Sequence, residues 1–335
     1  MYIAHYVTHF KQRFDLVINT SSDDNADDAR NVIDGWLVSR TNPSTRYRIR
    51  DAVPRFNELE SKNYADNFGL QWNRFRKTQF DSETGLPLTA DRFWTNTRWT
   101  KEGLRGKLVL EVGCGAGRFT EIIQAAGAQV VSFDLSNAVD ANYANSGSHS
   151  NVLLFQGDIF NIPFPDDHFD FVFCYGVLQH TPDPDAAYNS ILAKLKKGGK
   201  MSIDYYLAIE GLSPWSTPKY RWRPITTRLP PKLLLRIIQA YMPLWLPIDT
   251  LLRRIPLIGY RLVAGLSIPC WNYLGFGLTY RQRLQWAILD TFDALAPLYD
   301  LPKTLPQVQK MIHRASNASE EVFLGSNGVV ANVTK

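Results

Sequence analysis

Residues 108–119 read LVLEVGCGAGRF and place three glycines, Gly113, Gly115 and Gly117, directly after a short apolar run. Glycine is needed where the backbone adopts a positive φ or where a ligand touches the backbone. After the first strand of a doubly wound α/β domain, such a turn presents backbone N–H groups at a helix N-terminus, beside the binding crevice. A tight strand-to-helix turn without a ligand is the alternative, and the glycine spacing alone leaves it open.

The segments around this turn alternate between strand-like and helical patterns. Strands are predicted at 107–113, 129–135, 151–158, 169–177 and 200–207, and helices at 117–126, 137–146 and 184–196. Short runs rich in β-branched and aromatic residues favour strands, and strand–helix alternation gives right-handed crossovers. Near the end of the chain, Asn327-Gly328 lies between two β-prone runs, which predicts a hairpin. We therefore predict an α/β fold with a doubly wound, mostly parallel seven-stranded sheet.

Four regions follow from the pattern of the chain. Residues 1–60 hold strand-like stretches (YVTHF, DLVINTS, GWLVS and RYRIRDAVPRF) and the acidic stretch SSDDNADDA, which predicts a small β-rich module. Residues 61–106 read as amphipathic helices that lead into the sheet and cover its binding site. The core is predicted at 107–207 and 287–335. Residues 208–286, rich in proline and apolar helical stretches, form a predicted helical insertion after the fifth strand.

Composition and charge limit the class of protein. The 335 residues are 45% hydrophobic and 21% charged, as in a soluble globular protein with a sizeable core. Three widely spaced cysteines and a first segment without a signal-peptide pattern predict a cytoplasmic location. Between residues 211 and 286 there are eleven Lys/Arg and one acid, a charge of +10, so the remainder carries −5 (5 − 10). The insertion is therefore the basic part of the molecule.

Acidic residues close the second and third predicted strands. Asp134 lies 21 positions after Gly113, where a carboxylate is able to accept both ribose hydroxyls, and Asp158 is placed to meet an adenine amino group. Each could instead cap the helix that follows it. Together they predict an adenosine-containing ligand. Glu111 and the G-x-G-x-G spacing disfavour a pyrophosphate, whose usual turn is G-x-G-x-x-G, and favour S-adenosylmethionine over NAD.

Four segments, LEVGCGAGRF, VVSFDLS, QGDIFNIPFPDDHFDFVFCYGVLQHTPDP and LKKGGKMSI, resemble successive motifs of class I S-adenosylmethionine-dependent methyltransferases of the type-11-like group. The resemblance covers about residues 105–207 and implies a Rossmann-like methyltransferase core. One departure is Gln179, where many relatives have a second His before His180. The resemblance implies three sets of contacts with the cofactor. At the methionine part it implies Gly113, Cys114, Gly115 and Gly117, the backbone of Tyr175 and Gly176, and Glu111 near the amino group. It also implies Asp134 at the ribose, and Leu135, Asp158 and Ile159 at the face and edge of the adenine.

The stretch GWLVSRTNPSTRYRIRDAVPRF is similar to the end of zinc-ribbon modules that accompany some methyltransferases. Such modules bind zinc through paired Cys or His ligands. Residues 1–100 contain no cysteine and only His5 and His9. We therefore predict a degenerate module without a metal.

Three side chains are candidates for the chemistry of the acceptor. His180 follows the fourth strand and is a candidate general base, with a structural hydrogen bond in the TPDP turn as the alternative. Tyr205 and Tyr206 end the fifth strand, and strand alternation lets only one of them face the acceptor. Gln71 and Trp72, in the helix before the sheet, are predicted to close over the cofactor, although ordinary helix packing would also explain them.

The acceptor is predicted to be a small molecule, a glycan or a lipid-linked compound, methylated at oxygen. The basic insertion suggests an anionic acceptor or contact with a membrane surface at the inner face. A solvated basic face over a local core, or a dimer contact, would also explain it. Its apolar runs are broken by Arg and Pro, which disfavours a spanning helix. Two other activities stay open: an RNA-modifying methyltransferase that uses the basic insertion, and a NAD-dependent Rossmann oxidoreductase.

Overall fold

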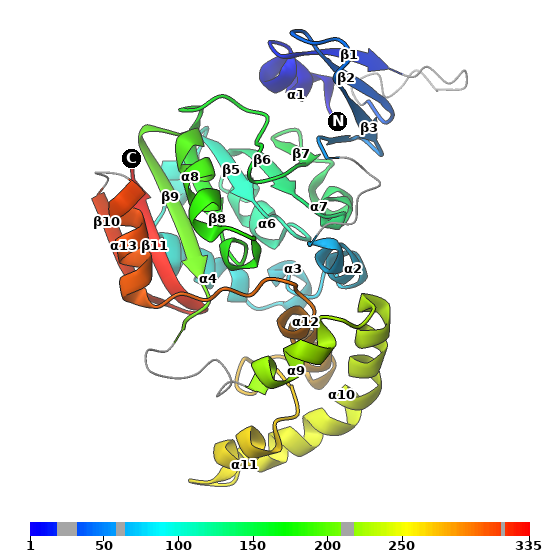
Figure 1. Ribbon diagram of the computed structural model, residues 1–335, viewed down its shortest axis with the longest axis vertical. Helices are drawn as coiled ribbons and strands as arrows, with labels where there is room; N and C mark the ends of the chain where they lie inside the picture. The colour runs from blue at the N-terminus through cyan, green and yellow to red at the C-terminus, as the bar shows by residue number, and fades with distance from the viewer. Residues whose placement is uncertain (19–31, 58–63, 209–217, 316–318) are drawn as a thin grey trace.

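The computed structural model describes residues 1–18, 32–57, 64–208, 218–315 and 319–335 (Figure 1). The end of the predicted strand DLVINTS, the acidic stretch after it and the start of the predicted insertion lie outside these residues. The strands are β1 (Phe14–Ile18), β2 (Gly35–Ser39), β3 (Arg46–Arg50), β4 (Val53–Arg55), β5 (Leu108–Val112), β6 (Gln129–Asp134), β7 (Val152–Gln156), β8 (Phe169–Cys174), β9 (Leu195–Tyr205), β10 (Ser319–Gly325) and β11 (Gly328–Thr334).

Helices occupy the predicted helical stretches of the core. Further helices lie in the predicted insertion and just after it, and they form a separate layer. They are α1 (Ile3–His5), α2 (Asp66–Arg74), α3 (Asp81–Thr84), α4 (Leu88–Thr97), α5 (Lys101–Leu104), α6 (Arg118–Ala125), α7 (Ala138–Ser146), α8 (Pro184–Lys194), α9 (Pro218–Thr226), α10 (Pro231–Arg253), α11 (Gly259–Leu266), α12 (Tyr280–Leu295) and α13 (Leu305–Ala315). Two short turns are a π-helical turn η1 (Tyr6–Phe10) and a 3₁₀ turn η3 (Leu178–His180).

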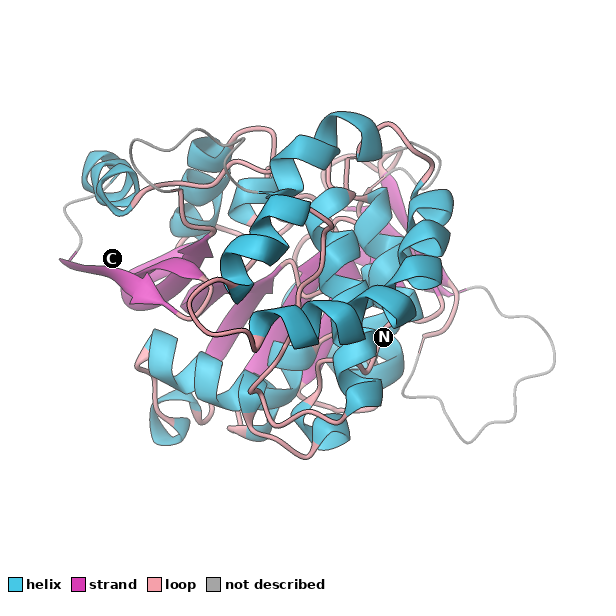
Figure 2. Ribbon diagram, turned by 90° about the horizontal axis from the view of Figure 1, so that it is seen from below, coloured by secondary structure: helices cyan, strands magenta, loops and turns pink. Residues whose placement is uncertain are grey.

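The described strands form one mixed sheet of eleven, in the order β1-β2-β3-β4-β7-β6-β5-β8-β9-β11-β10. Strands β5 to β9 are parallel to their neighbours among themselves, and β11 and β10 are antiparallel. Helices cover both faces of the sheet, as Figure 2 shows, and apolar clusters lie under each layer. The sheet exceeds the predicted seven strands because the N-terminal strands β1 to β4 join it at β7.

The stretch YVTHF is wrong as a strand prediction, because residues 6–10 form η1. His5 and Phe10 are both buried, and Phe10 packs against Phe14, Phe56 and Phe164. Residues five apart point to opposite faces of a strand, whereas one turn of i→i+5 bonding brings them to the same side. Burial of both side chains therefore selects the helical turn.

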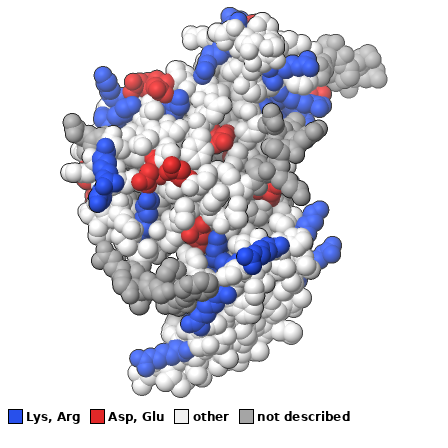
Figure 3. Space-filling view, viewed as in Figure 1, with Lys and Arg blue, Asp and Glu red and all other residues white. Residues whose placement is uncertain are grey.

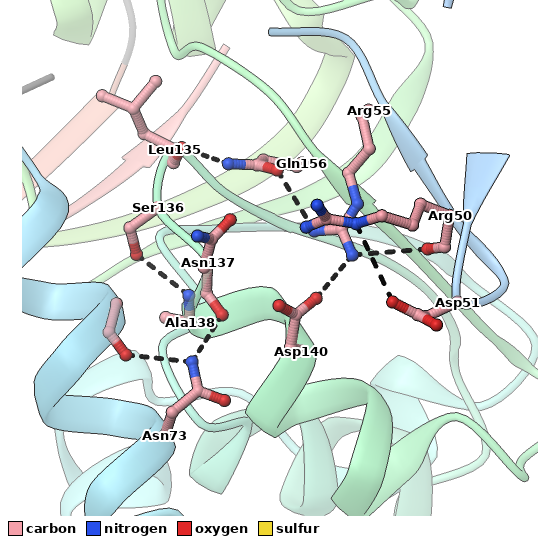
Figure 4. A network of polar contacts seen from close by, with 11 residues as sticks. Arg50, Asp51, Arg55, Asn73, Leu135, Ser136, Asn137, Ala138, Asp140 and Gln156 are labelled. Carbon is pink, nitrogen blue, oxygen red and sulfur yellow. Dashed lines mark hydrogen bonds and ion pairs between the residues drawn. The ribbon is translucent and has the colours of Figure 1, made fainter. Parts of the chain in front are cut away.

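A buried arginine ties the N-terminal strands to the core (Figure 4). Arg55, at the end of β4, is 1% exposed, and it donates from Nη1 to Gln156 Oε1 at 3.1 Å and from Nη2 to Asp140 Oδ1 at 2.5 Å. Gln156 in turn donates to the carbonyl of Leu135 at 3.0 Å. The network therefore reaches from β4 through β7 to the end of β6.

Removing the acid of this network should destabilise the fold. In Asp140→Ala the buried guanidinium of Arg55 loses its counter-charge, and a buried charge left without its partner is costly. We expect a loss of about 2 kcal/mol in the free energy of unfolding, because Arg55 keeps its other hydrogen bonds. Urea unfolding measures it. Asp15→Ala is the matched control: the Arg40–Asp15 ion pair is 45% and 57% exposed, so its loss should cost under about 1 kcal/mol.

Helices α9, α10 and α12 form a separate layer at the end of the sheet where the parallel strands finish (Figure 1). Leu235 and Met242 of α10 share a core with Leu289 and Phe292 of α12. The helical layer thus continues through Leu295, beyond the predicted end of the insertion at residue 286. In the described part of the chain, no helix is both long and apolar enough to cross a bilayer.

Candidate active site

A cavity of about 440 Å³ lies between the carboxyl ends of the parallel strands and the helices α2, α4 and α12. This is within the size range of small-molecule sites, at the position where doubly wound sheets bind ligands. One wall comes from the loops after β5, β6, β7 and β8. The facing wall is rich in aromatic side chains: Tyr64, Phe68, Trp72, Phe75, Phe80, Trp271, Tyr273, Phe276 and Trp286.

The glycine turn forms the floor of this cavity. Gly113, Cys114 and Gly115 line it, with φ values of +68° at Gly113 and +53° at Gly115. A Cβ on Gly115 would lie 3.1 Å from the indole of Trp72, which lines the same space. The group that crowds Gly115 is therefore Trp72. A ligand close to this backbone, as the sequence predicts, stays a prediction.

Gly176, after β8, leaves room in the cavity wall. It has a φ of +72°, and no atom lies within 4 Å of the place where its Cβ would stand. Its amide donates to Asp204 Oδ1 at 2.6 Å, while Tyr175 and Gly176 both line the cavity. A side chain at this position would enter the space that a ligand would use.

Asp134 is the carboxylate that the structure brings to this floor. Its Oδ2 accepts the Gly115 amide at 3.0 Å, and its Oδ1 accepts the amide and the hydroxyl of Ser136 at 2.9 and 2.7 Å. Burial raises the pKa of Asp134, and these hydrogen bonds counteract the shift. The oxygens are thereby fixed at the wall beside Leu135 and Ile159. An acceptor of hydroxyl hydrogen bonds, an apolar surface and a glycine floor fit an adenosine cofactor.

Five predicted site residues are absent from the cavity wall that the described residues form: Gln71, Glu111, Gly117, Asp158 and Tyr205. Gln71 is buried and donates to Asp293 Oδ1 at 2.9 Å. A Cβ on Gly117 would meet Asn142, so this glycine serves packing. Asp158 accepts the Phe160 amide at 3.0 Å, although its neighbours Gly157 and Ile159 line the cavity.

Glu111 is used inside the protein. It is 1% exposed, and its Oε2 accepts the hydroxyls of Thr120 at 2.5 Å and Ser132 at 2.8 Å. Burial raises its pKa to about 7. The carboxylate therefore joins α6 to β5 and β6, and the predicted contact with an amino group is not what its surroundings show.

Glu111 should make stability depend on pH. Its pKa is 4.5 in the unfolded reference and about 7 in the fold, so between these pH values the native state holds the proton and the unfolded chain does not. Stability therefore falls as pH rises from about 4.5 to about 7. In Glu111→Gln this pH-dependent loss of stability, about 3 kcal/mol between the two pH values, should disappear. Urea unfolding at a series of pH values tests it, and an unchanged slope would contradict it.

His180 lies in the cavity wall on η3. Its Nδ1 is 2.9 Å from the carbonyl oxygen of Tyr299. A carbonyl accepts only, so Nδ1 carries a proton, and in the neutral form of the ring the lone pair is on Nε2. That Nε2 is buried, with no hydrogen-bond partner among the described residues. The rings of Phe68 and Tyr206 pack against the imidazole at 5.2 and 5.4 Å.

Strand alternation separates the two tyrosines at the end of β9. Tyr206 lines the cavity and donates to Asp293 Oδ2 at 3.1 Å. Tyr205 is 0% exposed and its hydroxyl meets Pro184 and Met311 in the core. Tyr206 is therefore the one that faces the site.

Several charged groups in the cavity wall were not predicted. Arg92 of α4 pairs with Asp204 at 2.7 Å, and Arg118 of α6 donates to Gln79 at 2.5 Å. Asp290 and Asp293 lie one turn apart on α12 and both line the cavity. Burial, and next Asp293, raise the pKa of Asp290 to about 7. Two acids at i and i+3 on a largely apolar helix were the sequence signal for this pair.

In the N-terminal region the structure gives no support for a zinc-ribbon module. Among the described residues, no group of three or more His, Cys, Asp or Glu side chains is arranged to hold a metal ion. His5 and His9 stack at 6.1 Å, and burial lowers the pKa of each to about 4. The prediction of a metal-free module stays a prediction.

Part of this chain is similar in sequence to known methyltransferases. Residues 110–203 match the family model described as a methyltransferase domain. Curated relatives include a ubiquinone biosynthesis O-methyltransferase of Coxiella burnetii (35% identity; 29% of this chain and 43% of that protein) and a demethylmenaquinone methyltransferase of Thermobifida fusca (31%; 35% and 52%). A sterol 24-C-methyltransferase of Gibberella zeae is 35% identical over 30% of this chain and 28% of its own.

The chain spans about half the length of these relatives or less. Among solved structures, it is similar to a SAM-dependent methyltransferase from Aquifex aeolicus, with 14% identity, a TM-score of 0.38, and coverage of 82% of this chain and 97% of that one. The family match covers the glycine turn, Asp134 and His180. Residues 110–203 are therefore similar to a methyltransferase domain, and this part of the chain carries most of the cavity's sheet-side wall.

Proposed function

We propose that this protein transfers a methyl group from S-adenosylmethionine to an oxygen atom of a small-molecule, glycan or lipid-linked acceptor. The observation that carries the choice of oxygen is His180. Its Nδ1–H is held by the Tyr299 carbonyl, and its Nε2 is buried without a partner among the described residues, in the wall of the cavity that also contains Gly115 and Asp134. An alcohol acceptor must lose a proton, and an imidazole in this tautomer is able to take it.

The residues of this chain would act as follows. When bound, S-adenosylmethionine supplies an electrophilic methyl group, and Gly113, Gly115 and Asp134 would hold it. His180 Nε2 takes the proton of the acceptor hydroxyl as the oxygen attacks. The Tyr299 carbonyl keeps the ring oriented and stabilises the imidazolium that forms. The aromatic wall excludes water and orients the acceptor, since rate in such a displacement depends on alignment.

The cavity wall also bears on the acceptor's chemistry. Of the eleven basic residues that the sequence places between 211 and 286, the described wall includes only Lys219, whose Nζ pairs with Asp300 at 2.6 Å. The wall near α12 instead carries Asp290, Asp293 and four aromatic side chains. Carboxylates accept hydrogen bonds from hydroxyls, and aromatic rings pack on apolar or sugar surfaces. These groups favour a hydroxylated acceptor with an apolar part over a strongly anionic one.

A labelling experiment tests the proposal. The purified protein is incubated with S-adenosylmethionine labelled in its methyl group and an extract of the source cells, and the labelled product is identified by mass spectrometry. We expect one labelled small molecule, stable to alkali if it is a methyl ether. Alkali-labile label would point to a carboxylate acceptor, and label in RNA would overturn the proposal in favour of the nucleic-acid alternative.

Ligand binding separates the cofactor question from the acceptor question. S-adenosylhomocysteine should raise the melting temperature of the protein, and the rise should grow with the logarithm of its concentration above the dissociation constant, while NADH should leave the melting temperature unchanged. The opposite result would restore the oxidoreductase alternative.

A further inference from the structure

The outward face of α10 is apolar along its whole length. Its exposed residues include five large apolar side chains, which we call the outer stripe: Leu233, Ile237, Leu244, Ile248 and Leu251, exposed by 45%, 45%, 73%, 47% and 64%. Their spacing of three, four or seven positions puts them on one side of the helix. The opposite side, with Leu235, Met242 and Leu246, packs in the core of the helical layer. A surface helix normally turns a polar face outward, so α10 departs from that pattern.

The apolar surface continues beyond the helix. Leu257 is 97% exposed in the turn after α10, Ile258 is 50% exposed, and Tyr260 and Leu266 of α11 are 67% and 53% exposed. Helices α10 and α11 lie against one another at the lower end of the molecule in Figure 1. We call the outer stripe and these residues together the α10–α11 surface. A contiguous exposed apolar surface of this kind marks a site of contact.

Basic side chains surround this surface. Exposed Lys/Arg side chains of the helical layer are Arg221, Arg228, Lys232, Arg236, Arg254, Arg261 and Arg281. Arg221 donates to Ser267 Oγ at 2.6 Å, and the other six make no ion pair within the described residues. On a helical projection, Lys232, Arg236 and Arg254 lie along one edge of the outer stripe. In residues 218–286 the single acid is Asp249, which is 0% exposed and pairs with Arg253. Figure 3 shows the lower end of this face in white and blue.

We propose that the α10–α11 surface docks on an anionic lipid bilayer, with α10 lying in the plane of the membrane. Large apolar side chains flanked by Lys and Arg, without exposed acid, match the chemistry of such an interface: the apolar groups enter the acyl boundary and the cations meet the lipid headgroups. Pairing with a second copy of this chain would set these basic edges against each other unless acids faced them, and the described part of the surface offers none.

Hydrogen bonds connect α10 to a segment that lines the cavity. Trp271, Tyr273 and Phe276 line the cavity, and the segment that carries them is tied to α10. Asn272 Nδ2 donates to Asp249 Oδ2 at 2.5 Å, and Tyr280 donates to the Pro243 carbonyl at 3.3 Å. Phe276 is 49% exposed, so this segment runs from the cavity to the outside. A docked protein would hold the cavity near the headgroup region, where an acceptor with an apolar part resides.

Vesicle sedimentation with the full chain tests the docking. The wild type should sediment with vesicles of phosphatidylcholine and phosphatidylglycerol, bind pure phosphatidylcholine far less, and lose binding as salt increases. Two triple variants should each bind these vesicles at least about tenfold more weakly. The first removes apolar side chains and combines Leu244→Glu, Leu251→Glu and Leu257→Glu. The second removes positive charges and combines Arg236→Ser, Arg254→Ser and Arg261→Ser.

Matched controls use exposed residues elsewhere. Leu324→Glu changes a side chain of β10 that is 61% exposed, and Lys11→Ser with Lys101→Ser and Lys310→Ser removes three exposed positive charges outside the helical layer. Both controls should bind vesicles as the wild type does. Circular dichroism and binding of S-adenosylhomocysteine should be unchanged in every variant, so a failure of the proposed reaction and a failure of docking give different results.

Three outcomes would overturn the docking proposal. The first is equal binding of the wild type and the surface variants. The second is equal loss of binding in the controls. The third is a concentration-dependent dimer, seen by sedimentation velocity and abolished by Leu244→Glu, which would assign the surface to a second copy.

Discussion

Substitution of His180 by alanine should lower the turnover number about 10²–10⁴-fold. The imidazole is held by a single oriented hydrogen bond from Nδ1 to Tyr299, and its other nitrogen has no partner among the described residues. No other histidine lines the cavity within those residues. If the acceptor is an alcohol, proton removal then falls to water, which lacks this placement.

Two measurements on the His180 variants distinguish an effect on the rate of methyl transfer from an effect on cofactor binding. Single-turnover rates of methyl transfer should fall in His180→Ala, while the dissociation constant for S-adenosylhomocysteine should change by less than about threefold, because no charged contact of the cofactor is lost. His180→Gln is a useful companion, since it retains a polar side chain without a comparable base. Unchanged turnover in both variants would remove His180 from the mechanism and favour a carboxylate acceptor, which needs no base.

Substitution of Asp134 by alanine should weaken binding of S-adenosylhomocysteine about 100-fold. The carboxylate is 8% exposed, and its oxygens are held by Gly115 and Ser136 at the floor of the cavity. Loss of a charge-assisted hydrogen bond costs about 1.5–3 kcal/mol, and the Gly115 amide also loses its acceptor. Isothermal titration calorimetry with S-adenosylhomocysteine gives the affinity directly.

Asp158→Ala is the matched control for this prediction. The sequence pattern treats the two aspartates alike, but the side chain of Asp158 is absent from the described cavity wall and caps the Phe160 amide. Its removal should change the affinity by less than about fivefold, since it removes one local hydrogen bond. Equal losses in the two variants would show that Asp158 turns toward the cofactor on binding, as the family resemblance implies.

The core of the fold was predictable because local pattern and tertiary structure agree there. The strand around Leu110, the helix after Gly117 and the hairpin at Asn327-Gly328 were each indicated by periodicity and turn chemistry. The glycine turn and Asp134 were predictable for the same reason, since position at a strand end fixes them in the site. The attachment of the N-terminal module to the core was less predictable. Its strand β4 joins the core sheet where Arg55 pairs with Gln156, and these two residues are 101 positions apart in the sequence.

Apart from Trp72, the facing wall of the cavity could not be predicted from sequence. Arg92 comes from α4, whereas Trp286 and Asp290 come from α12, and only packing of these two helices over the sheet brings them together. Glu111 is absent from the described cavity wall for a related reason. Its place before the first glycine fixes the backbone, whereas burial between Thr120 and Ser132 decides where the carboxylate points. A sequence motif therefore predicts where a residue lies along a strand more reliably than it predicts which groups its side chain contacts.

The pairing of β4 with β7 has a consequence for any shortened form of this protein. All five residues of β7 are buried, and Phe155 packs against Phe56 at 5.5 Å. A chain that starts at residue 64 would present the unpaired amides and carbonyls of β7, with apolar side chains beside them, as a template for strands of other molecules. Such a fragment should self-associate and precipitate even though it retains all the residues that line the cavity.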